Sequence, residues 1–197
     1  GSYNTAVGES ALRSNTTAPN NTAVGYRASH DNTTGTRNVS MGVDAMYQTT
    51  TGNDLVGIGA EALTRNTTGS NNVAIGKEAL SRNTTASYNT AVGYQAMLAN
   101  TTGTESVGIG SRALASQTTG RNTAVGFFAG QDITTGSSNT MLGQEAGENT
   151  TTGGNNVAVG NHALRANTTA SNNTALGSQA GLNTTTGTGN LLLGSAA

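Results

Sequence analysis

The chain has no cysteine, no tryptophan, one proline, two phenylalanines and five tyrosines among its 197 residues. The lack of cysteine excludes disulfides and thiolate metal sites. Charged residues make up only 10% of the chain, and its nine basic and ten acidic residues are scattered. No basic patch therefore indicates binding to nucleic acid or to an anionic membrane. The scarcity of large apolar side chains argues against a conventional globular enzyme core.

Long hydrophobic runs are also missing. The clearest apolar run is Leu191, Leu192 and Leu193, whereas a transmembrane helix needs about 20 apolar residues. We therefore expect no membrane insertion by this segment, and it contains no signal peptide. Intrinsic disorder usually accompanies high net charge or abundant proline, and the chain has neither.

Threonine, asparagine and glycine are abundant instead: 35 Thr, 24 Asn and 28 Gly account for 87 of the 197 positions. They are arranged in a repeat, because a phrase of the type Asn-Thr-Ala-Val-Gly returns twelve times. Successive closing glycines are seventeen residues apart, except for one interval of sixteen, where we place the missing residue between Gly120 and Asn122. The closing glycines are Gly8, Gly25, Gly42, Gly59, Gly76, Gly93, Gly110, Gly126, Gly143, Gly160, Gly177 and Gly194.

The residues before each closing glycine have the pattern of a β-strand. The residue directly before it is aliphatic in all twelve copies, as in Val7, Ile58 and Leu193; these residues form the aliphatic column. Two residues earlier stands Val, Thr or Leu, in what we call the Thr/Val column. This period of two predicts that both columns point into a core. The residue between them, in the small column, is usually Ala, Gly or Ser, which indicates a close neighbour on the other side of the strand.

A second apolar pair follows each glycine. The third residue after it is alanine in all twelve copies (the alanine column), and the next is mostly Leu or Met (the Leu/Met column). Neighbours in an extended segment face opposite sides, so the pair predicts two apolar faces. In later copies Gly130, Gly147 and Gly181 replace the Leu, which indicates either a local change in packing or simple drift. A Thr-Thr pair then marks a turn.

These features predict an all-β fold, a parallel β-solenoid of about twelve 17-residue coils in a single array over residues 1–197. The unit is too short for a propeller blade or a two-helix repeat. Stacked coils would form a rod roughly 55 to 60 Å long. The asparagine four residues before the glycine, absent only at Leu55 and Ser106, would form a ladder of amides that satisfy one another. Because each coil has a thin core, we expect self-association through the Leu/Met column and the small column.

The phrases Asn72-Val73-Ala74-Ile75-Gly76 and Asn156-Val157-Ala158-Val159-Gly160 resemble the head repeats of YadA-like trimeric autotransporter adhesins. The longer unit from Asn89 to Gly103 is similar to repeats of phage tail-fibre proteins. The resemblance covers essentially the whole chain and implies a left-handed, trimeric β-roll, although YadA-like heads typically use shorter coils. It also implies an extracellular location, on a cell surface or a virion fibre. The pattern begins and ends in mid-unit, which is expected of a piece of a longer fibrous protein.

The function expected from this resemblance is structural and adhesive, in a bacterial surface adhesin or a phage tail fibre. The partners expected are two further copies of the chain in a homotrimer and a host-surface glycan or matrix protein. A ligand-binding module for glycans or matrix proteins is the alternative, although Tyr26, Arg27, Tyr47 and Tyr94 are too dispersed to prove one. An ice-binding β-solenoid is a further reading. It is weakened because adjacent threonines would face opposite sides, leaving one threonine column per face.

No residues are assigned to a catalytic, cofactor-binding or metal site; ligand-binding residues are unknown, and no enzyme activity is expected. His30 and His162 are interpreted as surface residues, since neither has a second ligand at metal-binding spacing. The acidic residues just after a turn glycine, Glu9, Glu61, Glu78, Glu105 and Glu145, are interpreted as a solvated face. Asn-X-Thr sequons at Asn15, Asn66, Asn83, Asn100 and Asn167 follow from the turn sequence, so glycosylation is not expected.

Overall fold

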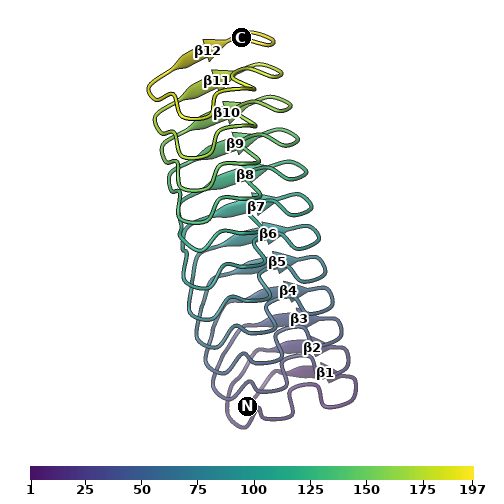
Figure 1. Cartoon of the computed structure of the whole chain (residues 1–197). Coiled ribbons are helices and arrows are strands. Elements are labelled where there is room, and N and C mark those ends of the chain that lie inside the picture. Colours follow the sequence, from purple (N-terminus) through teal and green to yellow (C-terminus); the bar gives the residue numbers. More distant parts are fainter.

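The chain folds into a rod of stacked coils, with its N-terminus at one end and its C-terminus at the other (Figure 1). A computed structural model describes residues 1–197, which contain twelve three-residue strands and no helix. The strands are Thr5–Val7 (β1), Thr22–Val24 (β2), Val39–Met41 (β3), Val56–Ile58 (β4), Val73–Ile75 (β5), Thr90–Val92 (β6), Val107–Ile109 (β7), Thr123–Val125 (β8), Thr140–Leu142 (β9), Val157–Val159 (β10), Thr174–Leu176 (β11) and Leu191–Leu193 (β12). The predicted parallel β-solenoid is confirmed.

All twelve strands form one parallel sheet in chain order. Their register is the repeat itself: Val73 lies opposite Thr90 and Ala74 opposite Ala91, seventeen residues further along the chain. Equivalent residues of every coil therefore stack into a column along the rod. Hydrogen bonding between coils continues beyond the strands, because only 22 of the 132 backbone hydrogen bonds lie within them. In the loops, for example, Leu63 N–H donates to the Ala79 carbonyl at 3.0 Å.

The direction of the strand side chains is opposite to that predicted. The small column points into the rod and is fully buried from Ala23 to Ala175. The aliphatic and Thr/Val columns point outward, and none of their side chains is buried. The reason is space: an ideal Cβ on Gly57 would lie 2.7 Å from Met46 Cγ of the preceding coil. Only Ala, Ser or Gly fits there beside a large neighbour, and a shift of one residue reverses every side chain of a strand.

The alanine and Leu/Met columns also differ from the prediction, because both point into the same core. Ala62 and Leu63 are each fully buried, as are Ala96 and Met97. Leu63 has a φ of 52° and Met97 a φ of 53°, so the chain is left-handed at this point rather than extended. That turn brings two successive side chains to the same side. The Leu/Met and small columns are therefore the core of a single chain and are not available for self-association.

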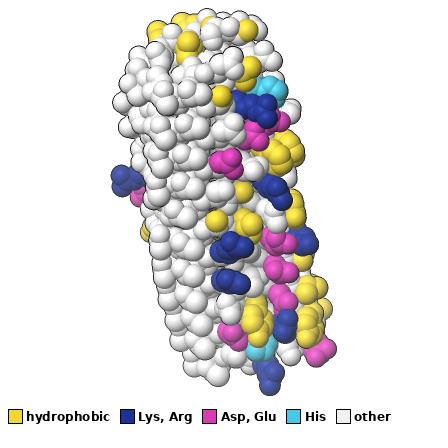
Figure 2. Space-filling model, viewed as in Figure 1, with side chains coloured by type: hydrophobic (Ala, Val, Ile, Leu, Met, Phe, Trp, Pro, Cys, Tyr) yellow, Lys and Arg dark blue, Asp and Glu magenta, His cyan; other side chains and the backbone are white.

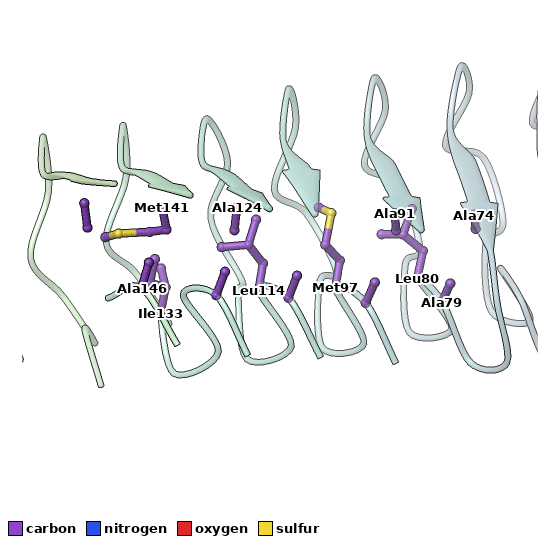
Figure 3. Close-up of a cluster of buried hydrophobic side chains, with 14 of the residues drawn as sticks. Ala74, Ala79, Leu80, Ala91, Met97, Leu114, Ala124, Ile133, Met141 and Ala146 are labelled. Atoms are coloured by element: carbon purple, nitrogen blue, oxygen red, sulfur yellow. The ribbon is translucent and has the colours of Figure 1, made fainter. Parts of the chain in front are cut away.

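The core keeps its volume by exchanging large and small residues between coils. Most Leu/Met-column residues face the small-column residue of the next coil (Figure 3). Leu is followed by Ala, Met by Gly, and Gly181 by Leu192; Ser29 and Ser40 form a 2.8 Å hydrogen bond between their hydroxyls. Two coils depart from this pairing, because the space beside Gly130 is filled by Ile133 of its own coil and the space beside Gly147 by Met141 of its own coil. The glycines of the later coils are thus compensated, and the rod shows no drift there.

The buried asparagines bond to the backbone more than to one another. Asn89 Nδ2 donates to the Gly103 carbonyl at 2.9 Å, and its Oδ1 accepts from Ser106 N–H at 3.1 Å. Each such side chain therefore ties its coil to the next at two points. Direct amide-to-amide bonds, such as Asn156 Nδ2 to Asn139 Oδ1 at 3.1 Å, occur only in part of the column. The expected amide ladder exists mainly as an amide-to-backbone ladder.

The shortened coil lacks a threonine rather than the residue that the sequence suggested. Arg121 N–H donates to the Thr104 carbonyl at 2.9 Å, which is the bond made by the residue before the buried asparagine in other coils. Thr118 keeps the first-threonine position, because its Oγ1 donates to the Thr134 carbonyl at 3.0 Å. Thr119 stacks on Gly103, where other coils have Gly or Ala. The deletion thus removes the second threonine of the pair and leaves the core register intact.

Candidate functional surfaces

An apolar strip runs the length of the rod on the outside of the sheet. It consists of the aliphatic and Thr/Val columns, and we call it the aliphatic face. Met41, Ile75 and Val125 are among its exposed members. Apart from threonine hydroxyls, it carries no polar side chain. Single exposed apolar residues are ordinary on a protein surface, but a continuous strip indicates an interaction site.

A second surface is polar and uncharged. Both members of the Thr-Thr pairs are solvent-accessible throughout the rod. The first threonine of many pairs donates its hydroxyl to the carbonyl of the next coil, as Thr67 does to Thr84 at 3.0 Å. The second is exposed in every coil that contains it. We call these paired columns the threonine face.

Most of the charged side chains visible in Figure 2 gather along one edge of the rod, beside a broad area with few charged or hydrophobic side chains. Many of them pair with the residue directly above or below in the stack. Arg27 donates two hydrogen bonds of 2.8 and 2.7 Å to Asp44, and this hydrogen bonding to the carboxylate raises the pKa of the guanidinium. Arg165 donates to Glu148 at 2.7 Å, and the pKa of Arg165 is likewise raised by that hydrogen bond.

Aromatic residues that are far apart in the sequence meet beside one of these pairs. The Arg27 guanidinium lies 4.8 Å from the ring centroids of both Tyr26 and Tyr47. His30 stacks on Tyr47 with 5.0 Å between ring centroids. The interpretation that Tyr26, Arg27 and Tyr47 are dispersed is therefore wrong for these three residues. The cluster is held together by its own cation–π contacts and ion pair.

A shallow groove of about 290 Å³ lies further along the charged edge. Glu61 and Glu78 lie on one side of it, in the second position after the closing glycine, and Arg65 and Arg82 lie four residues later in each coil. The groove is also lined by Thr64, Ser81, Gln95 and Leu98. A larger hollow of about 400 Å³ lies beside β12, where Leu192 and Gly181 are not covered by a further coil.

Glu78 is the most strongly held charge of the groove. Gln95 Nε2 donates to its carboxylate at 2.7 Å, and Lys77 Nζ lies 3.3 Å from the other oxygen. The hydrogen bond from Gln95, aided by Lys77 and Arg82, holds the pKa of Glu78 below its usual value. The acidic residues at this point therefore line a hollow instead of forming a uniformly solvated face.

The other residues considered from the sequence are separated. Four of the five sequon asparagines, Asn66, Asn83, Asn100 and Asn167, are fully buried, and each donates its amide to a carbonyl three residues on. A glycan cannot be attached to a buried amide in the folded chain. His30 contacts Asp31 and His162 contacts Glu145, and no group of three or more His, Asp or Glu residues could hold a metal ion.

The sequence signals for these surfaces lay in the columns rather than in motifs. Like charges at equivalent places in successive coils mark the groove, and large residues followed by small ones mark the core.

The structure has no helix of the length and hydrophobicity needed to span a lipid bilayer. No family model, curated protein or solved structure matches the chain.

Proposed function

We propose that this chain is a rigid segment of an extracellular fibre and that it associates side by side with further copies of itself, as a homotrimer, through the aliphatic face. The observation that carries the proposal is the continuous outward column of Val, Ile, Leu and Met on all twelve strands. Association through the Leu/Met column, expected from the sequence, is replaced by association through the opposite side of the same sheet.

A second copy is the partner that fits this face best. The strand face is roughly 55 Å long and about 10 Å wide, or roughly 550 Å². Stable interfaces bury about 800 Å² per partner. The exposed column after the closing glycine, with Tyr26, Val43, Tyr94 and Phe127, supplies additional apolar area beside it. Only a partner with the same repeat distance can place a side chain against every coil, and another copy of the chain has that distance.

Oligomeric mass measured by light scattering or sedimentation tests the proposal. We expect the native chain to have the mass of three copies. Replacing Ile58, Ile75 and Val92 by lysine should give a folded monomer, because three charges would be placed in the buried interface. The matched control replaces Thr68, Thr85 and Thr102 of the same coils by lysine and should leave the mass unchanged. A native chain that is a stable, well-folded monomer would contradict the proposal.

The kind of fibre can be tested from the gene. An adjoining coiled-coil stalk and membrane anchor would identify a bacterial adhesin, whereas a virion-attachment or chaperone domain would identify a phage tail fibre. Both assignments rest on the resemblance of the repeat phrase. Both give the rod the same role, namely reach, rigidity and contact with a surface.

The threonine face supports a second candidate function, binding to ice. Its two columns are on the surface, are uncharged and repeat with every coil at about 4.8 Å. A regular array of hydroxyl and methyl groups can order water. The test is thermal hysteresis, with the Thr68, Thr85 and Thr102 lysine variant as the matched control. No effect of the native chain on ice growth would eliminate this function.

A further inference from the structure

The groove on the charged edge breaks the charge pattern of the rod. Stacking in register places equivalent side chains of successive coils about 4.8 Å apart, where like charges repel and opposite charges attract. Most charged residues stacked in this way are therefore of opposite sign. These pairs are Arg27 with Asp44, Arg37 with Asp54, Glu105 with Arg121, and Glu148 with Arg165.

Acidic and arginine residues of like charge are stacked directly only beside the groove. Asp44, Glu61 and Glu78 succeed one another in one column, and Arg65 and Arg82 in another. Asp44 is neutralised by Arg27, but the side chains of Glu61, Arg65 and Arg82 form no hydrogen bond or ion pair. The two arginines and the two glutamates thus line the same hollow without forming an ion pair with one another. Departures of this kind from local consistency are expected at binding sites.

The floor of the groove is open because two small residues occupy it. Thr64 and Ser81 stand where the preceding coil has Tyr47 and the following coil has Leu98. The hollow therefore ends against an apolar side chain and spans about two coils. Its volume of about 290 Å³ is at the lower end of the range for ligand pockets. A single sugar ring is of this size, and a longer chain could continue along the rod.

We infer that this groove binds one residue of an acidic saccharide of the uronic acid type. Its carboxylate would lie between the Arg65 and Arg82 guanidiniums, which are suited to planar anions. Its hydroxyl groups would donate to Glu61 and Glu78, and the apolar face of its ring would pack on Leu98. A simple anion would donate no hydrogen bond to Glu61 and Glu78 and would be repelled by them. An acidic peptide would likewise leave the two glutamates without a hydrogen-bond donor, and the floor offers no apolar pocket for a peptide side chain.

Calorimetric titration of the full chain with D-glucuronate tests this inference, with D-glucose and inorganic sulfate as comparison probes. We expect D-glucose to bind at least about tenfold more weakly, since it lacks the carboxylate. Arg65→Gln and Arg82→Gln should each weaken glucuronate binding about tenfold, whereas the exposed Arg13→Gln should not. Glu61→Gln should weaken glucuronate but not sulfate. Glucuronate binding that is unchanged or strengthened in Glu61→Gln would reduce the groove to a plain anion site and overturn the inference.

A second pair of variants tests the cavity itself. Ser81→Tyr places in the floor the residue that Tyr47 already provides in the same column, so it should fold and abolish binding. Ala115→Tyr makes the same change in that column outside the groove and should bind as the native chain does. Undiminished binding by Ser81→Tyr would overturn the assignment. The inference does not depend on self-association, because the lysine variant of the aliphatic face should still bind glucuronate.

Discussion

Two parts of the rod solve the same packing problem in opposite ways. In the coil of Met97, the large side chain comes from the loop and the facing strand residue of the next coil is Gly108. In the coil of Gly181, the loop supplies the glycine and the next strand supplies Leu192, whose Cδ1 lies 2.7 Å from an ideal Cβ on Gly181. The comparison teaches that the unit of packing is a pair of residues in neighbouring coils, so the sequence of one coil is constrained by the next.

The largest loss of stability is expected when the large core side chain of a later coil is truncated. Met141→Ala should lower the free energy of unfolding by about 4 kcal/mol, because Gly147, which lies against the Met141 side chain, has no side chain of its own to fill the space. Met97→Ala, in the earlier coil, should cost about 3 kcal/mol. Urea unfolding followed by circular dichroism measures both. Thr85→Ala on the surface is the control, and a loss at Met141 no larger than the control would show that the pairs do not set stability.

Exchanging the large and the small residue of a pair should restore the stability that a single substitution removes. Gly108→Met should cost about 2 to 3 kcal/mol, since its Cβ alone would lie 2.8 Å from Met97 Cγ. Adding Met97→Gly should recover most of that loss, because it recreates the arrangement of Gly181 and Leu192, with the large side chain on the strand and the glycine in the loop. The coupling of the double-mutant cycle should be about 2 kcal/mol. Additive losses would mean that the two parts of the rod are not interchangeable.

The architecture could be predicted from the sequence because it depends on period alone. A 17-residue unit with a three-residue strand phrase leaves little choice other than stacked coils, and the columns follow. The direction of the columns could not be predicted, because Val and Ile outside with Ala inside reverses the usual hydrophobic pattern. The left-handed φ at Leu63 turns two successive residues inward, and its only signal in the sequence is the glycine that stands at the same position in three later coils.

The surfaces were predictable only in part. The groove depends on which coil positions lie beside one another across a turn, and the strand phrase does not contain that information. The clustering of Tyr26 and Tyr47 around Arg27 has the same cause, because stacking brings together residues about one repeat apart. The reciprocal large and small pairs, in contrast, could be found from the sequence by comparing each Leu/Met-column residue with the small residue eleven positions later.

Coils with and without a buried asparagine four residues before the closing glycine can be compared in the same way. Asn89→Leu should cost about 2 kcal/mol, because the Ser106 N–H would lose its partner inside the rod and the Gly103 carbonyl would keep only the bond from Asn100. Leu55 is the native counterpart, and Leu55→Asn should change stability by less than about 1 kcal/mol, since lost apolar burial offsets the new bonds. Chemical unfolding of both variants measures the difference. A neutral Asn89→Leu would mean that this column only fills space.

The smallest effect on stability is expected from the exposed ion pairs between adjacent coils. Arg37 and Asp54 form bonds of 2.6 and 2.7 Å in adjacent coils but remain largely exposed, so Arg37→Gln should lower the melting temperature only slightly at neutral pH. The hydrogen bond from Arg37 lowers the pKa of Asp54, so the pair stabilises the fold above the unfolded-state pKa of this carboxyl. That contribution is lost as the pH falls through the lowered pKa. The difference in melting temperature between native and variant chains should therefore vanish at acidic pH. A difference that persists there would assign the effect of Arg37 to packing of its side chain and not to its charge.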